Sequence, residues 1–318
     1  MWEGRWLDVS SPVRRVAIVG GTHGNELNGV YIQRALKMAG VRGEGFDVVM
    51  LEANPEAAKL NRRYVEEDLN RCFKVEDLEN PGRTSLEQNR AREINEILGP
   101  KKSKTPRADF VIDLHGTTSN SGTALMMHPK DSFSHALAAH LQHLDPSVRI
   151  CHWFDSESPT LPSVGRSGLT FEVGPISWGV VEPELYSNSL RLIQAALSYI
   201  AAHNSFVEGS SQLQTESCSV DAYARIRPVS FPRYESGEFQ GDLQAMLHPN
   251  LHGNDFSPLA IGDPIFKRWD GTDIYFDGPE EGEDLTFFFA NEAAYYEKNV
   301  AFVLARTRKL TIQRLKLS

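Results

Sequence analysis

Short apolar runs alternate with amphipathic segments through the first two thirds of the chain. The first run, residues 16–19, ends in two glycines and leads through a polar turn into residues 26–39, where apolar residues recur at helical spacing. The same patterns predict strands at 46–51, 110–114, 123–127, 149–154 and 169–173, and helices at 85–98, 133–144 and 184–203. This alternation predicts an α/β fold in which helices flank a mixed sheet.

The pattern changes near residue 208. Residues 208–219 are polar and rich in small side chains, which is typical of a linker. Beyond them, short β-forming runs are separated by Pro, Gly, Asn and Asp, and strands are expected at 223–229, 239–247, 264–269, 273–276, 285–290 and from 300 onward. We therefore expect an α/β domain over residues 1–207 and a smaller, all-β domain over residues 208–318.

Composition and charge narrow the class of protein. The chain has 318 residues, of which 41% are hydrophobic and 24% charged, and its net charge is −9. The negative charge and the lack of a Lys/Arg block argue against nucleic-acid binding. No run approaches the ~18 apolar residues of a membrane span, and the charged N-terminus does not resemble a signal peptide. Three scattered cysteines favour a reducing compartment, so we expect a cytoplasmic protein with no membrane partner.

Three candidate metal ligands lie at the predicted carboxyl ends of strands. His23 and Glu26 follow the first strand, and His115 comes directly after the strand at 110–114. Ligands bind at this edge of the sheet in α/β proteins. Zinc favours N and O ligands, and a catalytic zinc site usually has three protein ligands and one open position. The residues thus favour a catalytic zinc site.

Two other interpretations fit the same residues. Gly20, Gly21 and Gly24 follow a strand, as in a nucleotide-binding loop, but they lack the G-x-G-x-x-G spacing and no Gly-Lys-Ser/Thr follows. A non-catalytic metal-binding protein or scaffold would bind zinc without catalysing a reaction. We favour the catalytic metal site over both.

Further polar residues fit an enzyme that acts on an anionic substrate. Residues 56–83 form a long polar segment, and long loops of this kind are usually functional. Arg63, Asn70 and Arg71 lie in it, and no helical or strand-like pattern of apolar residues accounts for their positions. Arginine can hold a substrate carboxylate through two parallel hydrogen bonds. The alternative for any one of these residues is that it only balances charge on the protein surface. Glu172 lies within an apolar strand, where a carboxylate is costly unless it is paired, near a metal or used as a base. The alternative is a Glu on the solvent face of an edge strand.

Five sequence blocks together resemble the aspartoacylase and aminoacylase-3 family of zinc amidohydrolases, which are related to the zinc carboxypeptidases. The blocks are GGTHGNE (20–26), RRYVEEDLNR (62–71), DLHGTTSNSG (113–122), EVGP (172–175) and NEAAYYEK (291–298). They occur in order over nearly the whole chain. The resemblance implies a zinc-carboxypeptidase-like sheet with an added β-rich domain, one Zn²⁺ per subunit, a small N-acyl amino acid as substrate and a homo-oligomer.

The resemblance also implies a role for each matched residue. His23, Glu26 and His115 would bind zinc, and Glu172 would be the general base. Arg63 would polarise the scissile carbonyl. The substrate's α-carboxylate would be held by Asn70 and Arg71, and Tyr295 would come from the β-rich domain into the pocket.

Departures from the family pattern bear on the substrate. Family members specialised for N-acetylaspartate have Asn after the third zinc ligand, whereas Gly116 stands here. Ser158 and Pro162 align with their Tyr and Arg, which read the aspartate side chain. Arg166 could substitute if the loop is shifted.

We therefore expect aminoacylase-3-like hydrolysis of N-acetyl aromatic amino acids and mercapturates, with N-acetyl-L-aspartate as the alternative substrate. A zinc carboxypeptidase is the more distant alternative. Trp178 and Phe154 are candidates for an aromatic pocket, although core packing explains both.

Overall fold

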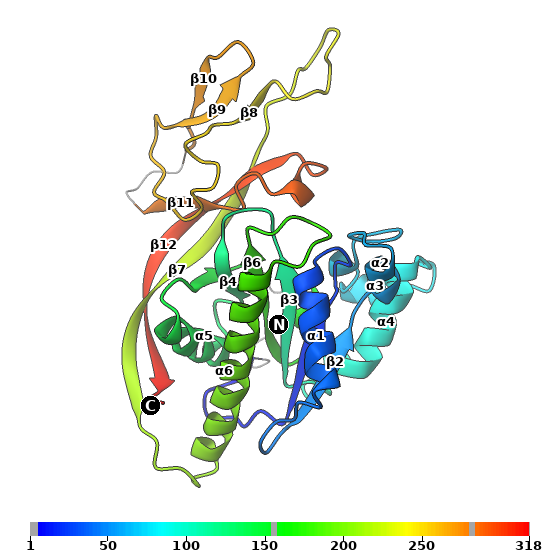
Figure 1. The fold of residues 1–318 in the computed structure, drawn as a ribbon, viewed down its shortest axis with the longest axis vertical. Helices are drawn as coiled ribbons and strands as arrows, with labels where there is room; N and C mark the ends of the chain where they lie inside the picture. The colour runs from blue at the N-terminus through cyan, green and yellow to red at the C-terminus, as the bar shows by residue number, and fades with distance from the viewer. Residues whose placement is uncertain (1–5, 154–157, 280–283, 318) are drawn as a thin grey trace.

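The computed structural model describes residues 6–153, 158–279 and 284–317 (Figure 1). Its main feature is a nine-stranded sheet in the order β11-β12-β7-β5-β4-β6-β3-β1-β2, and a separate three-stranded sheet has the order β10-β9-β8. The strands are β1 (Arg15–Gly20), β2 (Asp47–Glu52), β3 (Phe110–Gly116), β4 (Gly122–Met127), β5 (Arg149–His152), β6 (Ser167–Gly174), β7 (Thr215–Ser230), β8 (Ala245–Leu247), β9 (Pro264–Arg268), β10 (Asp273–Tyr275), β11 (Leu285–Phe288) and β12 (Val300–Leu315). The helices are α1 (Leu27–Met38), α2 (Pro55–Lys59), α3 (Val75–Glu79), α4 (Leu86–Leu98), α5 (Ser132–Leu144) and α6 (Pro183–Val207), with short 3-10 turns η1 (Leu69–Arg71), η2 (Leu161–Val164) and η3 (Ala293–Tyr295).

The large sheet is mixed, as the sequence predicts. Strands β2, β1, β3 and β6 are parallel to one another. Strand β4 runs antiparallel to β6, and β5 and β7 continue in the direction of β4. The carboxyl ends of β1, β3 and β6 therefore lie together at one edge, where ligands bind in such sheets.

Two apolar layers cover the two faces of this sheet. Helices α1, α5 and α6 bury side chains such as Ile32, Leu137 and Ile193 against one face, and α1 and α6 lie side by side (Figure 1). On the other face, α4 packs Ile94 and Leu98 beneath the turn η2. Helices on both faces confirm the predicted α/β class.

Local sequence signals account for the ends of two helices. Ser85 caps α4 by accepting a hydrogen bond from the backbone N of Gln88 at 3.0 Å, which satisfies a free donor of the first turn. Helix α1 stops at Met38, and Gly40 adopts a φ of +62° two residues later, as expected at a helix C-terminus.

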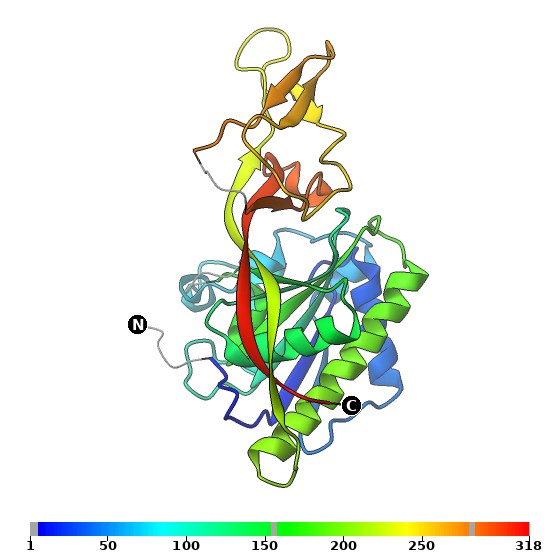
Figure 2. The same ribbon diagram turned by 90° about the vertical axis from the view of Figure 1, so that its left-hand side faces the viewer.

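The expected linker at 208–219 is partly wrong. Strand β7 begins at Thr215, pairs with β12 along its length and also pairs with β5. Figure 2 shows β7 and β12 running together from the α/β part into the β-rich part. The polar residues near position 215 lie in a paired strand with one exposed face, so polarity alone did not mark a boundary. The division at 207/208 remains a prediction.

The expected strand at 239–247 is also shorter than predicted. Only Ala245–Leu247 form a strand, because Gly237 and Gly241, both with a φ of +89°, form turns just before it. The long polar segment at 56–83 contains α2, η1 and α3, and Asn54 and Asp68 cap the first two of these. No helix in the described ranges is long and apolar enough to cross a membrane.

The β-rich part covers the carboxyl edge of the large sheet. It has its own apolar core, which includes Phe231, Phe266 and Phe302. A second cluster joins it to the sheet, where Phe288 and Phe289 pack near Met126 and Cys151. The segment carrying Tyr295 is thereby held above the ends of β3 and β6.

Candidate active site

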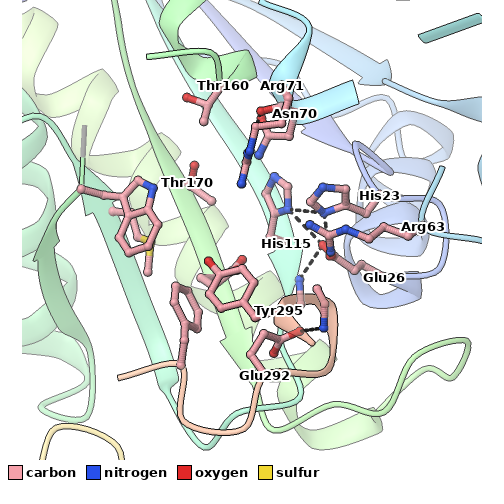
Figure 3. Close-up of a pocket in the computed structure, with 16 residues that line it drawn as sticks. His23, Glu26, Arg63, Asn70, Arg71, His115, Thr160, Thr170, Glu292 and Tyr295 are labelled. Carbon is pink, nitrogen blue, oxygen red and sulfur yellow. Dashed lines mark hydrogen bonds and ion pairs between the residues drawn. The ribbon is translucent and has the colours of Figure 1, made fainter. Parts of the chain in front are cut away.

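A pocket at the carboxyl edge of the sheet collects eight of the nine predicted site residues (Figure 3). Its polar lining consists of His23, Glu26, Arg63, Asn70, Arg71, His115, Thr160, Thr170, Glu172, Glu292 and Tyr295. Met126, Trp153 and Phe289 supply large apolar side chains. The lining comes from the turn after β1, from β3, β4 and β6, from residues that follow β5, from the 56–83 segment and from the β-rich part.

Close backbone packing places His23 and Glu26. They lie on the turn between β1 and α1, and a Cβ on Gly24 would stand 2.1 Å from the backbone carbon of Ala57. A Cβ on Gly20 would likewise stand 2.2 Å from the carbonyl oxygen of Gly29. Glycine at these two positions allows the turn to lie against α1 and α2.

His23, Glu26 and His115 form a buried group that could hold a metal ion, with candidate ligand atoms within 4.8 Å of one another. His23 Nδ1 lies 2.6 Å from Glu26 Oε1, and His115 Nδ1 lies 3.0 Å from Glu26 Oε2. The two Nδ1 atoms are 3.1 Å apart. Two facing imidazole lone pairs need a proton or a cation between them, so the donor set fits a metal ion.

Two further carboxylates orient the imidazoles. Asp68 Oδ1 lies 3.0 Å from His23 Nε2, and Asp113 Oδ2 lies 2.8 Å from His115 Nε2. A carboxylate at Nε2 favours a proton on that nitrogen and leaves Nδ1 as the electron-pair donor. This arrangement is typical of metal-binding histidines.

Electrostatics of the group keep its carboxylates ionised. Burial alone would raise the pKa of Glu26, but attraction to His23 and His115 outweighs it and holds that pKa well below its usual range. Burial would also raise the pKa of Asp68, but attraction to His23 and Arg63 outweighs it and holds that pKa well below its usual range. Glu26 therefore stays ionised as a ligand must.

Arg63 reaches the same group from the 56–83 segment. Its Nη1 donates to Glu26 Oε1 at 3.1 Å, and its Nη2 donates to Asp68 Oδ2 at 3.4 Å. Both contacts hold the guanidinium beside His23, Glu26 and His115, the candidate metal-ligand group.

Asn70 and Arg71 lie together at another end of the pocket (Figure 3). Asn70 Oδ1 accepts from the backbone N of Leu161 at 2.9 Å, which orients its amide group in the pocket lining. Arg71 Nη1 donates to the Asn70 carbonyl at 2.7 Å.

Glu172 lies in β6 opposite His115 in β3. Its Oε2 is buried and, within the described ranges, has no hydrogen-bond partner. Burial raises the pKa of Glu172 to about 8, and repulsion from Glu26 and Glu292 adds to this although His115 opposes it. A buried carboxylate with an unused oxygen and a pKa near neutrality suits proton transfer.

Glu292 anchors the segment that carries Tyr295. Its Oε2 accepts from the Thr118 backbone N at 2.7 Å, from Thr118 Oγ1 at 3.0 Å and also from Thr117 Oγ1. Its Oε1 caps η3 by accepting from Ala294 N at 3.1 Å. Burial raises the pKa of Tyr295 well above its usual range, so its hydroxyl remains a donor.

Arg166 does not reach the pocket. It directly precedes β6, whereas Glu172 lies near the carboxyl end of the same strand, and its backbone N donates to the Ala108 carbonyl. The shifted loop that would have moved Arg166 into the pocket is not present in the structure. Trp178 does not line this pocket but a separate small cavity, which Glu26 also lines. Phe154 lies outside the described residues.

Sequence reasoning missed several residues of the site. The sequence could have indicated Asp113. It precedes His115 by two residues, and residues two apart on a strand share a face. Asp68, Glu292, Met126, Trp153 and Phe289 reach the site through tertiary packing, and no local spacing marks them.

Comparison with known proteins places the chain in a family. The model of the succinylglutamate desuccinylase/aspartoacylase catalytic domain matches residues 12–200, and the AstE/AspA barrel-sandwich hybrid domain matches residues 218–307. The chain belongs to the succinylglutamate desuccinylase/aspartoacylase family.

Members of this family resemble the chain over nearly its full length. The human N-acyl-aromatic-L-amino acid amidohydrolase (carboxylate-forming) is 40% identical over 311 residues, which cover 94% of this chain and 92% of the relative. A probable aspartoacylase of Trichodesmium erythraeum is 36% identical, with 94% and 99% covered. The crystal structure of murine aminoacylase 3 superposes with a TM-score of 0.83 at 34% identity, covering 96% of this chain and 99% of that one.

Proposed function

We propose that this protein hydrolyses the amide bond of N-acyl-L-amino acids to a carboxylate and a free amino acid, with Zn²⁺ held by His23, Glu26 and His115. One observation carries the proposal. The facing Nδ1 atoms of two histidines and a carboxylate lie in the same pocket as Glu172, whose buried oxygen has no partner. A divalent ion bound there would polarise the scissile carbonyl and lower the pKa of a bound water from ~15.7 toward ~7.

The chain's own residues account for the other steps. Glu172 accepts a proton from the attacking water and returns it to the nitrogen of the departing amine. Arg63 donates hydrogen bonds to the oxyanion that develops on the acyl carbonyl, and removing one such donor typically costs about 3–4 kcal/mol of transition-state stabilisation. Asn70 and Arg71 hold the α-carboxylate, so that the acyl carbonyl lies beside the metal ligands.

The pocket favours an aminoacylase-3-like specificity over N-acetyl-L-aspartate. Among the described residues that line it, the cationic side chains other than histidine are Arg63 and Arg71. Both already have roles, and Arg166 lies at the other end of β6. A second buried carboxylate would lack a partner and would be costly to bind. Relatives named aspartoacylase keep N-acetyl-L-aspartate as the second candidate.

The experiment is a side-by-side measurement of kcat/KM for N-acetyltyrosine, N-acetylaspartate and a blocked dipeptide by zinc-loaded protein. We expect hydrolysis of N-acetyltyrosine to exceed that of the other two, and to stop when a chelator removes the metal. Cleavage of the dipeptide at its C-terminal residue would favour a carboxypeptidase. Zinc binding without hydrolysis of any amide would refute the proposal.

Two further features belong to this proposal. The family resemblance supports a homo-oligomer, which sedimentation at micromolar concentration would test. Three scattered cysteines support a cytoplasmic location, which imaging of the tagged protein would test.

A further inference from the structure

Three large apolar side chains form one continuous part of the pocket lining. Met126 in β4 is the cross-strand partner of Thr170 in β6, and Thr170 shares a face of β6 with Glu172. Trp153 follows β5, and its backbone N donates to the Met127 carbonyl at 3.2 Å. Phe289 follows β11 and packs its ring 5.7 Å from that of Trp153. We call Met126, Trp153 and Phe289 the apolar wall.

The wall is held in place by the side chains behind it. Phe288 packs 5.8 Å from the Trp153 ring, and the Arg225 guanidinium lies 4.8 Å from the same ring. Phe289 also contacts the Tyr295 ring at 5.5 Å. Aromatic and cation–π contacts of this kind fix ring orientation, so the wall is formed before any substrate arrives.

The polar residues fix which part of a substrate meets this wall, on the basis of the proposed function. Figure 3 shows Asn70, Arg71 and Thr160 at one end of the pocket, Glu292 at the opposite end, and the metal-ligand group to one side. With its carboxylate at Asn70 and Arg71 and its amide beside His115, the amino acid has one remaining large substituent. Thr170 lies on the side of the pocket away from the metal-ligand group (Figure 3), and its cross-strand partner Met126 begins the apolar wall there, so this is the side left for that substituent.

We propose that Met126, Trp153 and Phe289 bind the side chain of the amino-acid half of the substrate and select an uncharged aromatic or thioether group. Trp153 is the main specificity-determining residue because it offers the largest flat surface of the three. A rigid aromatic wall gains little from a methyl group but packs well against a ring or a sulfur atom. The wall touches no reacting atom, so it sets specificity and does not take part in catalysis.

The experiment compares kcat/KM for N-acetylphenylalanine with kcat/KM for N-acetylalanine in wild type, Trp153→Ala and Trp153→Phe. The ratio of the two values is independent of the folded fraction of a variant. We expect Trp153→Ala to lower this ratio by about tenfold, from the lost aromatic contact, and Trp153→Phe to keep most of it. Tyr223→Ala is the matched control, because Tyr223 belongs to the same aromatic cluster but does not line the pocket.

Calorimetric binding of the same two ligands to Glu172→Gln and to the double variant Glu172→Gln/Trp153→Ala separates this inference from the proposed function. In one outcome, wild type hydrolyses neither compound while binding still shows a Trp153-dependent preference for N-acetylphenylalanine. That result would refute the proposed function but support the role of the apolar wall. An unchanged ratio in Trp153→Ala, or an equal fall in Tyr223→Ala, would overturn the assignment. A change confined to N-hexanoylalanine relative to N-acetylalanine would overturn it too, because the wall would then bind the acyl chain.

Discussion

At the scale of single residues, the proposed metal site depends on two carboxylates that would not themselves bind the ion. Asp113 and Asp68 each hold the outer nitrogen of one histidine. These contacts would decide which histidine tautomer faces a bound metal ion, and therefore whether the inner nitrogen can donate its electron pair. Their removal should weaken metal binding without removing a ligand.

We expect Asp113→Asn to lower metal affinity by about 10- to 100-fold, the usual effect of losing such a partner. Competition with a chelator of known zinc affinity would measure it. Asp109→Asn is the matched control, because Asp109 accepts from the backbone N of Arg14 and Arg15 and lies outside the pocket lining. Equal zinc affinity in both variants would show that Asp113 does not orient His115.

A buried histidine away from the site should make stability depend on pH. His140 in α5 stacks on Tyr199 at 4.9 Å, and burial, together with the charges of Arg314 and His143, lowers the pKa of His140 to about 4. The folded state therefore keeps His140 neutral, while the unfolded chain takes up a proton as pH falls below 6.5. Its contribution to stability is complete above pH 6.5 and is lost as pH falls toward 4.

For His140 alone, linkage gives a loss of about 2 kcal/mol between pH 7 and pH 5. Urea unfolding of chelator-treated protein at both pH values would measure the loss, and His140→Gln should reduce it by about that amount. The exposed His252 provides the control variant. A pH dependence that is the same in His140→Gln and wild type would contradict this account.

At the scale of elements, close approach between α1 and β3 positions the turn that carries His23 and Glu26. A Cβ on Gly29 in α1 would stand 2.7 Å from the Leu114 carbonyl oxygen, a backbone atom that cannot easily move. Alanine would gain about 1 kcal/mol in helix propensity, but overpacking typically costs 1–3 kcal/mol. The second effect should win and push α1 away from the sheet.

We therefore expect Gly29→Ala to lower the free energy of unfolding by about 1 kcal/mol and to weaken zinc binding, because Glu26 directly precedes α1. Gly82→Ala serves as the control, since its Cβ would meet nothing nearer than the Asn80 side chain at 3.2 Å. Unfolding and zinc titration of both variants would test this. A more stable Gly29→Ala protein with unchanged zinc affinity would show that α1 has room to adjust.

Local sequence patterns predicted most elements of the α/β part. Strands β1, β3 and β6 and helices α1 and α4 appear within a few residues of their expected bounds, because apolar periodicity and capping residues act locally. The patterns failed where pairing partners are distant in sequence. The start of β7 at Thr215 depends on β12, about a hundred residues later, and no local signal indicates that pairing.

The site divides in the same way. His23, Glu26, His115 and Glu172 lie at strand ends, and the structure brings them together as strand order requires. Arg166 was expected in the pocket only if its loop is shifted. It directly precedes β6, so the direction of that strand places it at the end far from the pocket. Trp153 and Glu292 enter the pocket through contacts between the sheet and the β-rich part, which depend on the complete fold.

At the scale of the whole molecule, one carboxylate joins the two parts of the active site. Glu292 from the β-rich part accepts hydrogen bonds from residues 117–119, which follow the strand that carries His115. Hydrogen bonds to a charged acceptor are each worth roughly 1.5–3 kcal/mol. These contacts hold Tyr295 above the metal-ligand group.

We expect Glu292→Gln to lower kcat/KM by about 10- to 100-fold, the equivalent of one lost charged hydrogen bond, while zinc content stays unchanged. The amide NH₂ of glutamine cannot accept the hydrogen bonds that the carboxylate accepts. Glu297→Gln is the control, because Glu297 makes an exposed contact with Tyr64 between the same two parts. Equal activity in the two variants would mean that Glu292 does not position Tyr295.

The most direct test of the account is the turnover of Glu172→Gln, measured together with its zinc content. Glutamine keeps the shape of the side chain but cannot accept a proton from water. The account predicts one zinc per subunit, as in wild type, and a kcat for N-acetyltyrosine lowered by about 10²- to 10⁴-fold, the usual contribution of a general base. A zinc-loaded Glu172→Gln protein with near-normal kcat would contradict it and remove Glu172 from the reaction.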